Sequence, residues 1–378
     1  SATEAGTESG SETMRSGQFD IDYAKQVTKL ADYSGVAITV SNDYEINDAA
    51  KQTYLTNVLQ SYGADAYKQV TDRDTVADGD YVKVDYTGYK DGKAFDGGSA
   101  TDVMLDVTNN SQVGGSSFID GFTKPLIGAK VGGKVKGDVT FPEDYGKDDL
   151  NGQTVTFEYT VKGIYSADPV ALADMTDEQV NTVFGKAGVT TNAQLSTQIE
   201  KDLKQQLYSA EVDKIKSYMI DNSTVEIPDE YLQARLNEYI ASFTKENVKD
   251  GQTLKKYLKS NYNMTVDQAT EKWKENLTDQ IKTEFIFGLI AEKENIKMDD
   301  DAFNSYVDYI VSASNGQFSK ASEVYKYFGS GHKDEGKTYL KNQYLVNKAI
   351  DTVTEKANVT FEDGSAAPDT SSGSADAE

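Results

Sequence analysis

The sequence predicts an α+β protein in which an antiparallel β region and an all-α region follow one another along the chain. Two changes of hydrophobic period support this class. Between Gly79 and Tyr165, apolar and polar residues alternate in short runs separated by glycine-rich turns, which is typical of antiparallel strands. After Asp168 and Pro169 the period becomes 3.6 residues and stays so almost to Thr360, which indicates amphipathic helices.

The composition excludes several kinds of partner and reaction. The 378 residues suffice for two or three domains. A formal net charge of -24 makes the surface repel phosphate backbones and anionic lipid headgroups, so we expect no nucleic-acid partner. The absence of cysteine excludes disulfides and thiolate metal sites, and the single histidine, His332, lies in a loop-like stretch. We therefore expect no metal, no other cofactor and no catalytic triad.

Both ends of the chain are polar. Residues 1–35 begin with a stretch rich in serine, threonine, glycine and glutamate, which predicts a disordered tether, and residues 363–378 predict a disordered tail. No run of about 18 apolar residues occurs, so no membrane-spanning helix is expected. The start without methionine suits an exported chain whose leader was removed, with a lipid-modified cysteine just upstream. The alternatives are an expression boundary and a flexible cytoplasmic tail.

Residues 36–75 predict a short strand followed by an arm helix. In "GVAITVSN" three β-branched residues share one face of the strand: Val36, Ile38 and Val40. The helix is indicated by apolar residues at helical spacing, namely Ile46, Ala50, Tyr54, Val58 and Tyr62.

Residues 76–166 predict the β region. Its expected strands are "YVKVDYTG", "DVMLDVT", "KVKGDVTF" and "TVTFEYTVKGIY". The first of them runs into a turn at Asp91 and Gly92, a dipeptide typical of tight hairpins. A second turn is expected at Asp96 and Gly97.

Residues 167–362 predict the all-α region. Capping-box patterns start helices at Thr176 and Thr265, and Pro228 suits the first turn of another helix. Further helices are expected near 192–220, 299–313 and 334–357, and the longest near 266–295. Two helices carry apolar stripes, at Leu232, Leu236, Ile240 and Phe243, and at Ala269, Trp273, Leu277, Ile281, Phe285 and Leu289. Most of these residues are expected in the core, and some could line a cradle for extended apolar segments.

Four segments resemble the signature segments of the FKBP-type peptidyl-prolyl isomerases. They are "GDYVKVDYTGYKDGKAFDGG", "SFIDGFTKPLIGAKVGGK", "VTFPEDYG" and "VTFEYTVKGIY", and "TFPEDYG" is similar to the trigger factor branch. Residues 170–360 resemble the helical C-terminal (SurA-like) chaperone domain of trigger factor, and the resemblance covers residues 36–362. It implies an antiparallel half-barrel wrapped on a short helix near 119–127, followed by an all-α chaperone domain.

The resemblance also implies an isomerase pocket. An aromatic, water-poor cavity binds a twisted prolyl amide better than the planar one, because the twisted amide is less polar, and no proton transfer is needed. The implied catalytic residues are Tyr86, Phe95, Asp96, Ile119, Phe122, Tyr145 and Phe157, and the implied substrate-binding residues are Val103 and Phe118. In this scheme Phe122 forms the floor, Ile119 offers its N–H, and Tyr145 its hydroxyl. Asp96, oriented by Tyr86, lies beside the twisting carbonyl.

The expected function is that of an isomerase and chaperone for unfolded, newly exported polypeptides. Trigger factors dock on the ribosome through an N-terminal domain, and the chain before residue 36 is too short for one, so ribosome binding is not expected. We expect a lipid-anchored monomer or dimer on the outer face of a Gram-positive membrane, with the cytoplasm as the alternative. Two other functions stay open: a holdase chaperone whose FKBP-like module is inactive, and a surface adhesion or scaffold protein.

Overall fold

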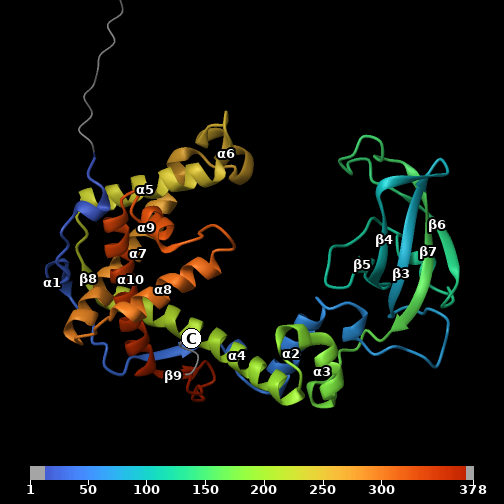
Figure 1. Ribbon diagram of the computed structural model, residues 1–378, viewed down its shortest axis with the longest axis horizontal. Coiled ribbons are helices and arrows are strands. Elements are labelled where there is room, and N and C mark those ends of the chain that lie inside the picture. Colours follow the sequence, from blue (N-terminus) through green and yellow to red (C-terminus); the bar gives the residue numbers. More distant parts are fainter. Residues whose placement is uncertain (1–12, 372–378) are drawn as a thin grey trace, which may run out of the picture. The chain divides into compact units, whose positions relative to one another are not determined.

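The computed structural model describes residues 13–371, which separate into two compact units (Figure 1). One unit is formed by residues 46–203 and contains the sheet. The other combines residues up to 45 with those from 204 onward and is mostly helical. An antiparallel sheet and a helical region are both present, so the predicted α+β class is confirmed.

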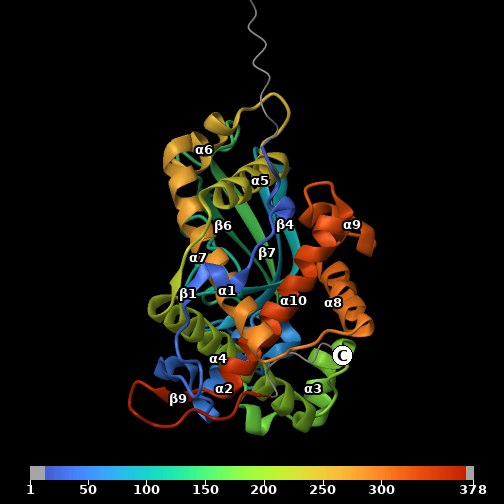
Figure 2. The same cartoon turned by 90° about the vertical axis from the view of Figure 1, so that its left-hand side faces the viewer.

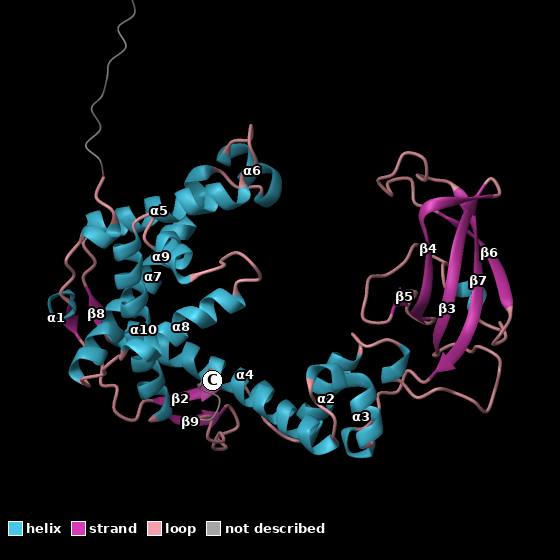
Figure 3. Cartoon of the chain, in the orientation of Figure 1, coloured by secondary structure: helices cyan, strands magenta, loops and turns pink. Residues whose placement is uncertain are grey.

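The sheet has five antiparallel strands in the order β5-β4-β3-β7-β6 (Figure 3). Their bounds are β3 Tyr81–Lys90, β4 Lys93–Asp106, β5 Ser111–Gln112, β6 Lys134–Thr140 and β7 Thr154–Tyr165. Alternate residues of β7 are buried, as a strand with one face on the core requires: Val155, Phe157, Tyr159 and Val161. The four strands predicted from the sequence are therefore confirmed.

The hairpin between β3 and β4 is longer than the sequence suggests. The predicted turn is confirmed, since Asp91 and Gly92 both have positive φ, 51° and 75°. No second turn ends the strand at Asp96 and Gly97, because β4 continues through both residues. The register instead shifts there, which makes a bulge in β4.

The short helix expected near 119–127 is reduced to a single 3-10 turn, η4, Lys124–Leu126. Gly121 has a φ of 81°, which is incompatible with an α-helix, and Pro125 offers no backbone donor. The half-barrel therefore packs on this loop, and the expected short helix is the 3-10 turn η4.

A small helical cluster completes this unit. Its elements are α2 Asp48–Leu59, η3 Ala64–Ala66, η5 Leu172–Asp174, α3 Asp177–Phe184, η6 Gly185–Ala187 and the start of α4, Asn192–Asn222. The predicted capping box at Thr176 and Gln179 is confirmed, and Asn47 caps α2 by accepting from the N–H of Ala50 at 2.9 Å. Leu55, Leu59 and Val180 belong to its buried core.

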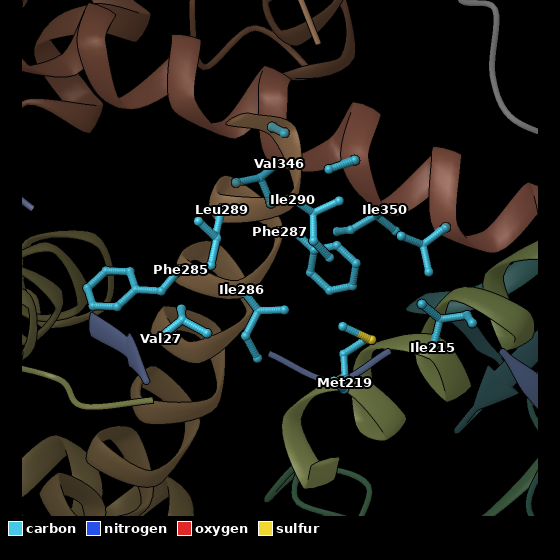
Figure 4. Packing of buried hydrophobic residues seen from close by; sticks show 14 of the residues in the cluster. Val27, Ile215, Met219, Phe285, Ile286, Phe287, Leu289, Ile290, Val346 and Ile350 are labelled. Atoms are coloured by element: carbon cyan, nitrogen blue, oxygen red, sulfur yellow. The ribbon is translucent and has the colours of Figure 1, made fainter. Parts of the chain in front are cut away.

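The second unit is built around α7. Its helices are α5 Asp229–Asn247, α6 Leu254–Tyr262, α7 Val266–Lys293, α8 Asp300–Ala313, α9 Ala321–Phe328 and α10 Lys333–Glu355, with the remainder of α4. Short strands tie its ends together: β2 Ala37–Val40 pairs in parallel with β9 Asn358–Phe361, and β1 Val27–Lys29 pairs antiparallel with β8 Thr224–Val225. Apolar side chains from α4, α7, α10 and β1 point toward one another in its core (Figure 4). None of the described helices is long and apolar enough to cross a membrane.

The expectation of a disordered tether over residues 1–35 is wrong for residues 13–35. This segment contains η1 Ser16–Gln18, α1 Tyr23–Gln26 and β1, and runs across α5, α7 and α10 (Figure 2). Arg15 pairs with Glu335 at 3.0 Å, and the Tyr23 ring packs on Phe285. The prediction rests on the polar residues at the start of the chain. Apolar residues that follow them, such as Phe19 and Ile21, pack against the core of the helical unit. The tether expected at 1–12 lies outside the described residues.

Three further expectations need correction. The tail expected at 363–378 is ordered as far as 371, because the buried Thr370 donates a hydrogen bond to Glu211 at 2.7 Å, and 372–378 lie outside the described residues. The strand and arm helix expected to form one part fall into different units, because β2 pairs with β9 whereas α2 packs with α3 and α4. Among the described helices α4, with 31 residues, is longer than α7, with 28.

Candidate functional site

A cavity of about 220 Å³ opens in the β-sheet unit and contains most of the predicted site. Eight of the nine predicted residues line it: Tyr86, Phe95, Asp96, Phe118, Ile119, Phe122, Tyr145 and Phe157. The ninth, Val103, packs on the core of the sheet instead and does not line the cavity. The structure thus brings together residues that lie up to 71 positions apart in the chain.

The bulge in β4 positions Phe95 and Asp96 at the cavity. A Cβ atom on Gly88 would lie 2.6 Å from the Phe95 ring, and one on Gly98 would lie 2.5 Å from it. Glycine is therefore required on both sides of this ring, because any side chain there would push it away. Phe157 also approaches Gly88, at 2.7 Å from the same hypothetical Cβ, so one glycine admits two aromatic rings.

Phe122 lies at the centre of the aromatic cluster and is only 2% exposed. Its ring meets Tyr86 at 5.0 Å and Phe157 at 4.8 Å between centroids, both edge-to-face, and stacks on Phe118 at 4.3 Å. The buried Tyr159 hydroxyl donates to the backbone carbonyl of Phe122. These contacts hold the Phe122 ring in one position, so Phe122 belongs to the core of the sheet as well as to the lining of the cavity.

Asn110 holds the loop that carries Phe118 and Ile119, and it is not among the predicted site residues. Its φ is 49°, and its side-chain amide donates to the carbonyls of Phe118 at 3.1 Å and Ile119 at 2.9 Å. The N–H of Thr123 donates to its Oδ1 at 3.0 Å. Only the local "NN" turn signal at this position could have suggested such a role.

Polar groups also line the cavity beside the rings. The N–H of Ile119 donates to no acceptor within residues 13–371, so it is available to a substrate carbonyl. Tyr145 is 41% exposed and its ring packs on Phe141 at 4.6 Å. Asp96 is exposed at the rim, and no hydrogen bond among the described residues joins it to Tyr86, contrary to the expected orientation. Burial, with the nearby Tyr145, raises the pKa of Tyr86, so its hydroxyl stays protonated at neutral pH.

Several lining residues were not selected from the sequence: Gly97, Gly98, Ser117, Phe141, Lys147 and Leu150. Phe141 could have been found, since it precedes Pro142 in the same "TFPEDYG" segment that indicated Tyr145. Together these groups form a cavity with aromatic walls, the free N–H of Ile119, and the polar side chains of Asp96, Ser117, Tyr145 and Lys147. Such a cavity can bind an apolar ring and stabilise a carbonyl oxygen, but the described residues include no cluster suited to a metal ion.

The helical unit carries a second aromatic feature, the aromatic patch, which consists of Tyr239, Phe243, Tyr257, Tyr262 and Trp273 on α5, α6 and α7. Tyr239 and Tyr262 are exposed, and the other three rings are half-buried. Trp273 lies 4.9 Å from Phe243 and 5.5 Å from Tyr239 between ring centroids. In contrast, most of the predicted stripe residues are core, as expected, including Leu236, Leu277, Ile281, Phe285 and Leu289. Tyr239 and Tyr262 therefore supply the exposed apolar area of the aromatic patch.

Comparison with known proteins gives two family matches and many relatives. Residues 190–355 match the bacterial trigger factor C-terminus, and residues 73–162 match the FKBP-type peptidyl-prolyl cis-trans isomerases. Trigger factor of Agathobacter rectalis is 28% identical over 86% of this chain and 69% of its own length. Trigger factor of Clostridium botulinum Eklund 17B is 29% identical over 73% of this chain and 62% of its own. That of Staphylococcus saprophyticus is 27% identical over 88% and 71%.

A solved structure of the trigger factor chaperone aligns with a TM-score of 0.45 at 18% identity, over 86% of this chain and 72% of that one. The chain thus spans about two thirds of the length of the relatives it matches. The two family matches follow one another in the same order as the sheet and the main group of helices. This chain accordingly combines an FKBP-type domain with a following trigger factor C-terminal-type domain, and it is similar to trigger factors over most of its length.

Proposed function

We propose that this chain catalyses the cis–trans isomerisation of X-Pro bonds in unfolded polypeptides and also holds such polypeptides as a chaperone. The observation that carries the catalytic part is the cavity of about 220 Å³, which is lined by aromatic side chains and by Ile119, whose N–H donates to no acceptor among the described residues. A chain with one histidine and no cysteine can perform this reaction, because no bond is broken and no proton is transferred.

The barrier to rotation about a prolyl amide is about 18–20 kcal/mol, and the twisted amide is less polar than the planar one. Rings of Phe95, Phe122 and Phe157 line the cavity, and an aromatic wall of this kind favours the less polar, twisted form. The N–H of Ile119 and the Tyr145 hydroxyl would hold carbonyl oxygens of the substrate. A rate gain of about 10⁴ requires a preference of only about 5.5 kcal/mol for the transition state.

The chaperone part rests on the aromatic patch. Exposed aromatic groups of this kind mark interaction surfaces, and tyrosine offers apolar area with a wettable edge. No deep groove is needed to hold an extended segment reversibly. The carboxylates that dominate the surface favour clients with basic residues, since the formal net charge is -24.

The experiment that tests the proposal compares two activities of the full chain. Isomerisation of a proline tetrapeptide measures catalysis, and suppression of aggregation of an unrelated unfolded protein measures the chaperone part. Suppression without isomerisation supports the alternative of an inactive FKBP-like client-binding module. If neither activity is present, the surface adhesion or scaffold alternative replaces the proposal.

We further propose that the clients are newly exported polypeptides and that the protein is held by a lipid anchor on the outer face of a bacterial membrane, without binding ribosomes. The polar start of the sequence and the absence of cysteine support the exported location. The formal net charge of -24 supports the absence of ribosome binding, because it disfavours contact with ribosomal RNA. Homologous trigger factors are typically cytoplasmic chaperones, so the cytoplasm is the competing location. Fractionation of cells that express the complete gene decides between the two, and recovery with cytoplasmic proteins would refute the membrane location.

A further inference from the structure

The floor of the candidate pocket is covered in this structure. The Phe118 ring stacks on Phe122 with centroids 4.3 Å apart and planes inclined by 24°, whereas the other rings meet Phe122 by their edges. With these neighbours Phe122 is only 2% exposed. A prolyl ring therefore cannot lie flat on Phe122 until one of the neighbouring rings leaves.

Phe118 is the neighbour that can leave. Tyr86, Phe157 and Tyr159 stand on β3 and β7, the two central paired strands of the sheet, and Tyr159 and Phe157 are buried. Phe118 instead belongs to the loop between β5 and η4 and is half-exposed. Of the four rings that contact Phe122, the Phe118 ring is thus the one that stands on a loop rather than on a strand of the sheet.

The backbone beneath Phe118 is fixed, so only its side chain is free to move. The Phe118 N–H donates to the Asn110 carbonyl at 2.9 Å, and the Asn110 amide donates back to the Phe118 carbonyl at 3.1 Å. Rotation about side-chain bonds swings the ring outward without moving the loop. The N–H of the next residue, Ile119, keeps its position for the substrate.

We propose that Phe118 is a gate that occupies the place of the prolyl ring on Phe122 and swings aside when an X-Pro segment enters. The inference rests on the proposed isomerase function. After it moves, the Phe118 ring lies beside the residue that precedes proline, because it stays at the cavity wall next to Ile119. Phe118 thereby favours substrates in which that residue is apolar or aromatic.

The gate lowers apparent affinity, since only the open fraction of molecules binds. For the full chain with the Phe118→Ala substitution we expect the KM of a Gly-Pro tetrapeptide to fall about 2- to 10-fold, the range that stacking of one aromatic pair spans. The preference for a Leu-Pro over a Gly-Pro tetrapeptide should fall at the same time. Phe118→Leu, which keeps apolar volume but cannot stack, should lower the KM for Gly-Pro while retaining the Leu-Pro preference. A higher KM in both variants would overturn the gate, because Phe118 would then be a fixed binding wall.

A structural readout is independent of turnover. In the full chain with labelled phenylalanine, the nuclear Overhauser effect between the Phe118 and Phe122 rings should be present in the free protein and lost with saturating Leu-Pro tetrapeptide. Persistence of this signal in the saturated complex would overturn the inference. If the peptide binds but is not isomerised, the isomerase proposal fails, and the ring signal still decides on the gate.

Discussion

Replacing Gly88 by alanine tests directly whether the packing of two rings against β3 shapes the candidate pocket. The new Cβ would lie 2.6 Å from the Phe95 ring and 2.7 Å from the Phe157 ring, whereas ordinary contacts of a Cβ lie at 3.4–4 Å. Both rings must therefore retreat by about 1 Å. Overpacking of this kind costs about 1–3 kcal/mol of stability. A displacement of about 1 Å in a catalytic site can lower a rate by about 10²-fold, so we expect at least a tenfold loss of isomerase activity.

The assay pairs urea unfolding with tetrapeptide isomerisation, and Gly163→Ala is the matched control. Gly163 lies on β7 outside the cavity, and its Cβ would meet only side-chain atoms, the nearest being Cε2 of Tyr165 at 3.1 Å. This control should keep its activity and lose about 1 kcal/mol at most. Equal activity and stability in the two variants would refute the claim that Phe95 and Phe157 are held by the absence of a side chain at Gly88.

Three further predictions concern charge and exposed surface. Burial alone would raise the pKa of Asp80, but hydrogen bonds from Arg73 and from the N–H of Ala77 bring the pKa below its usual value. The ionised carboxylate therefore stabilises the fold above about pH 4, and this stabilisation is lost as the pH falls through the lowered pKa. Asp80→Asn should therefore cost about 2 kcal/mol in urea unfolding at pH 7 and clearly less at pH 3, and an equal cost at both pH values would contradict the pairing. Glu284→Gln should lower the free energy of unfolding by about 3–5 kcal/mol, because it leaves the Arg235 guanidinium buried without its carboxylate partner. The double variant with Arg235→Met and Glu284→Leu should lose far less stability, because it removes both charges. A loss below about 1 kcal/mol in the single variant would argue against the buried pair. Trp273→Ser should weaken the suppression of client aggregation by the full chain, because Trp273 belongs to the aromatic patch. The control Tyr309→Ser changes an exposed ring outside the patch and should not weaken it. Identical effects of the two variants would exclude the patch as the client surface.

Local signals predicted much of the fold. The alternation in β7 and the capping boxes at Thr176 and Thr265 depend on residues within one element, so the sequence alone located them. The ordering of residues 13–35 was missed, since it depends on partners more than 200 residues away, such as Glu238 and Glu335. The composition of a segment predicts its behaviour in isolation. It does not indicate whether residues elsewhere in the chain form a surface on which the segment packs.

The candidate pocket was predicted from motifs, and its missed features are those that require packing. The bulge in β4 depends on Gly88 and Gly98 admitting the Phe95 ring from two strands, which no single motif records. The same holds for Phe122: the family resemblance implies that it forms the floor of the pocket, and in the structure the Phe118 ring stacks on it. Because Phe122 is also a core residue, Phe122→Ala should unfold part of the sheet and is a poor test of catalysis.

Isomerisation of an X-Pro tetrapeptide by the full chain is the most direct test of the central claim. Asp96 suits this test, since it is exposed at the rim of the cavity and its removal leaves no hole in the core, and Asp148 is a matched exposed carboxylate outside the lining. We predict that the unaltered chain accelerates the isomerisation, that Asp96→Ala lowers the rate at least tenfold, and that Asp148→Ala leaves it unchanged. Equal rates for all three proteins, or no acceleration by any of them, would contradict the assignment of this cavity as an isomerase site.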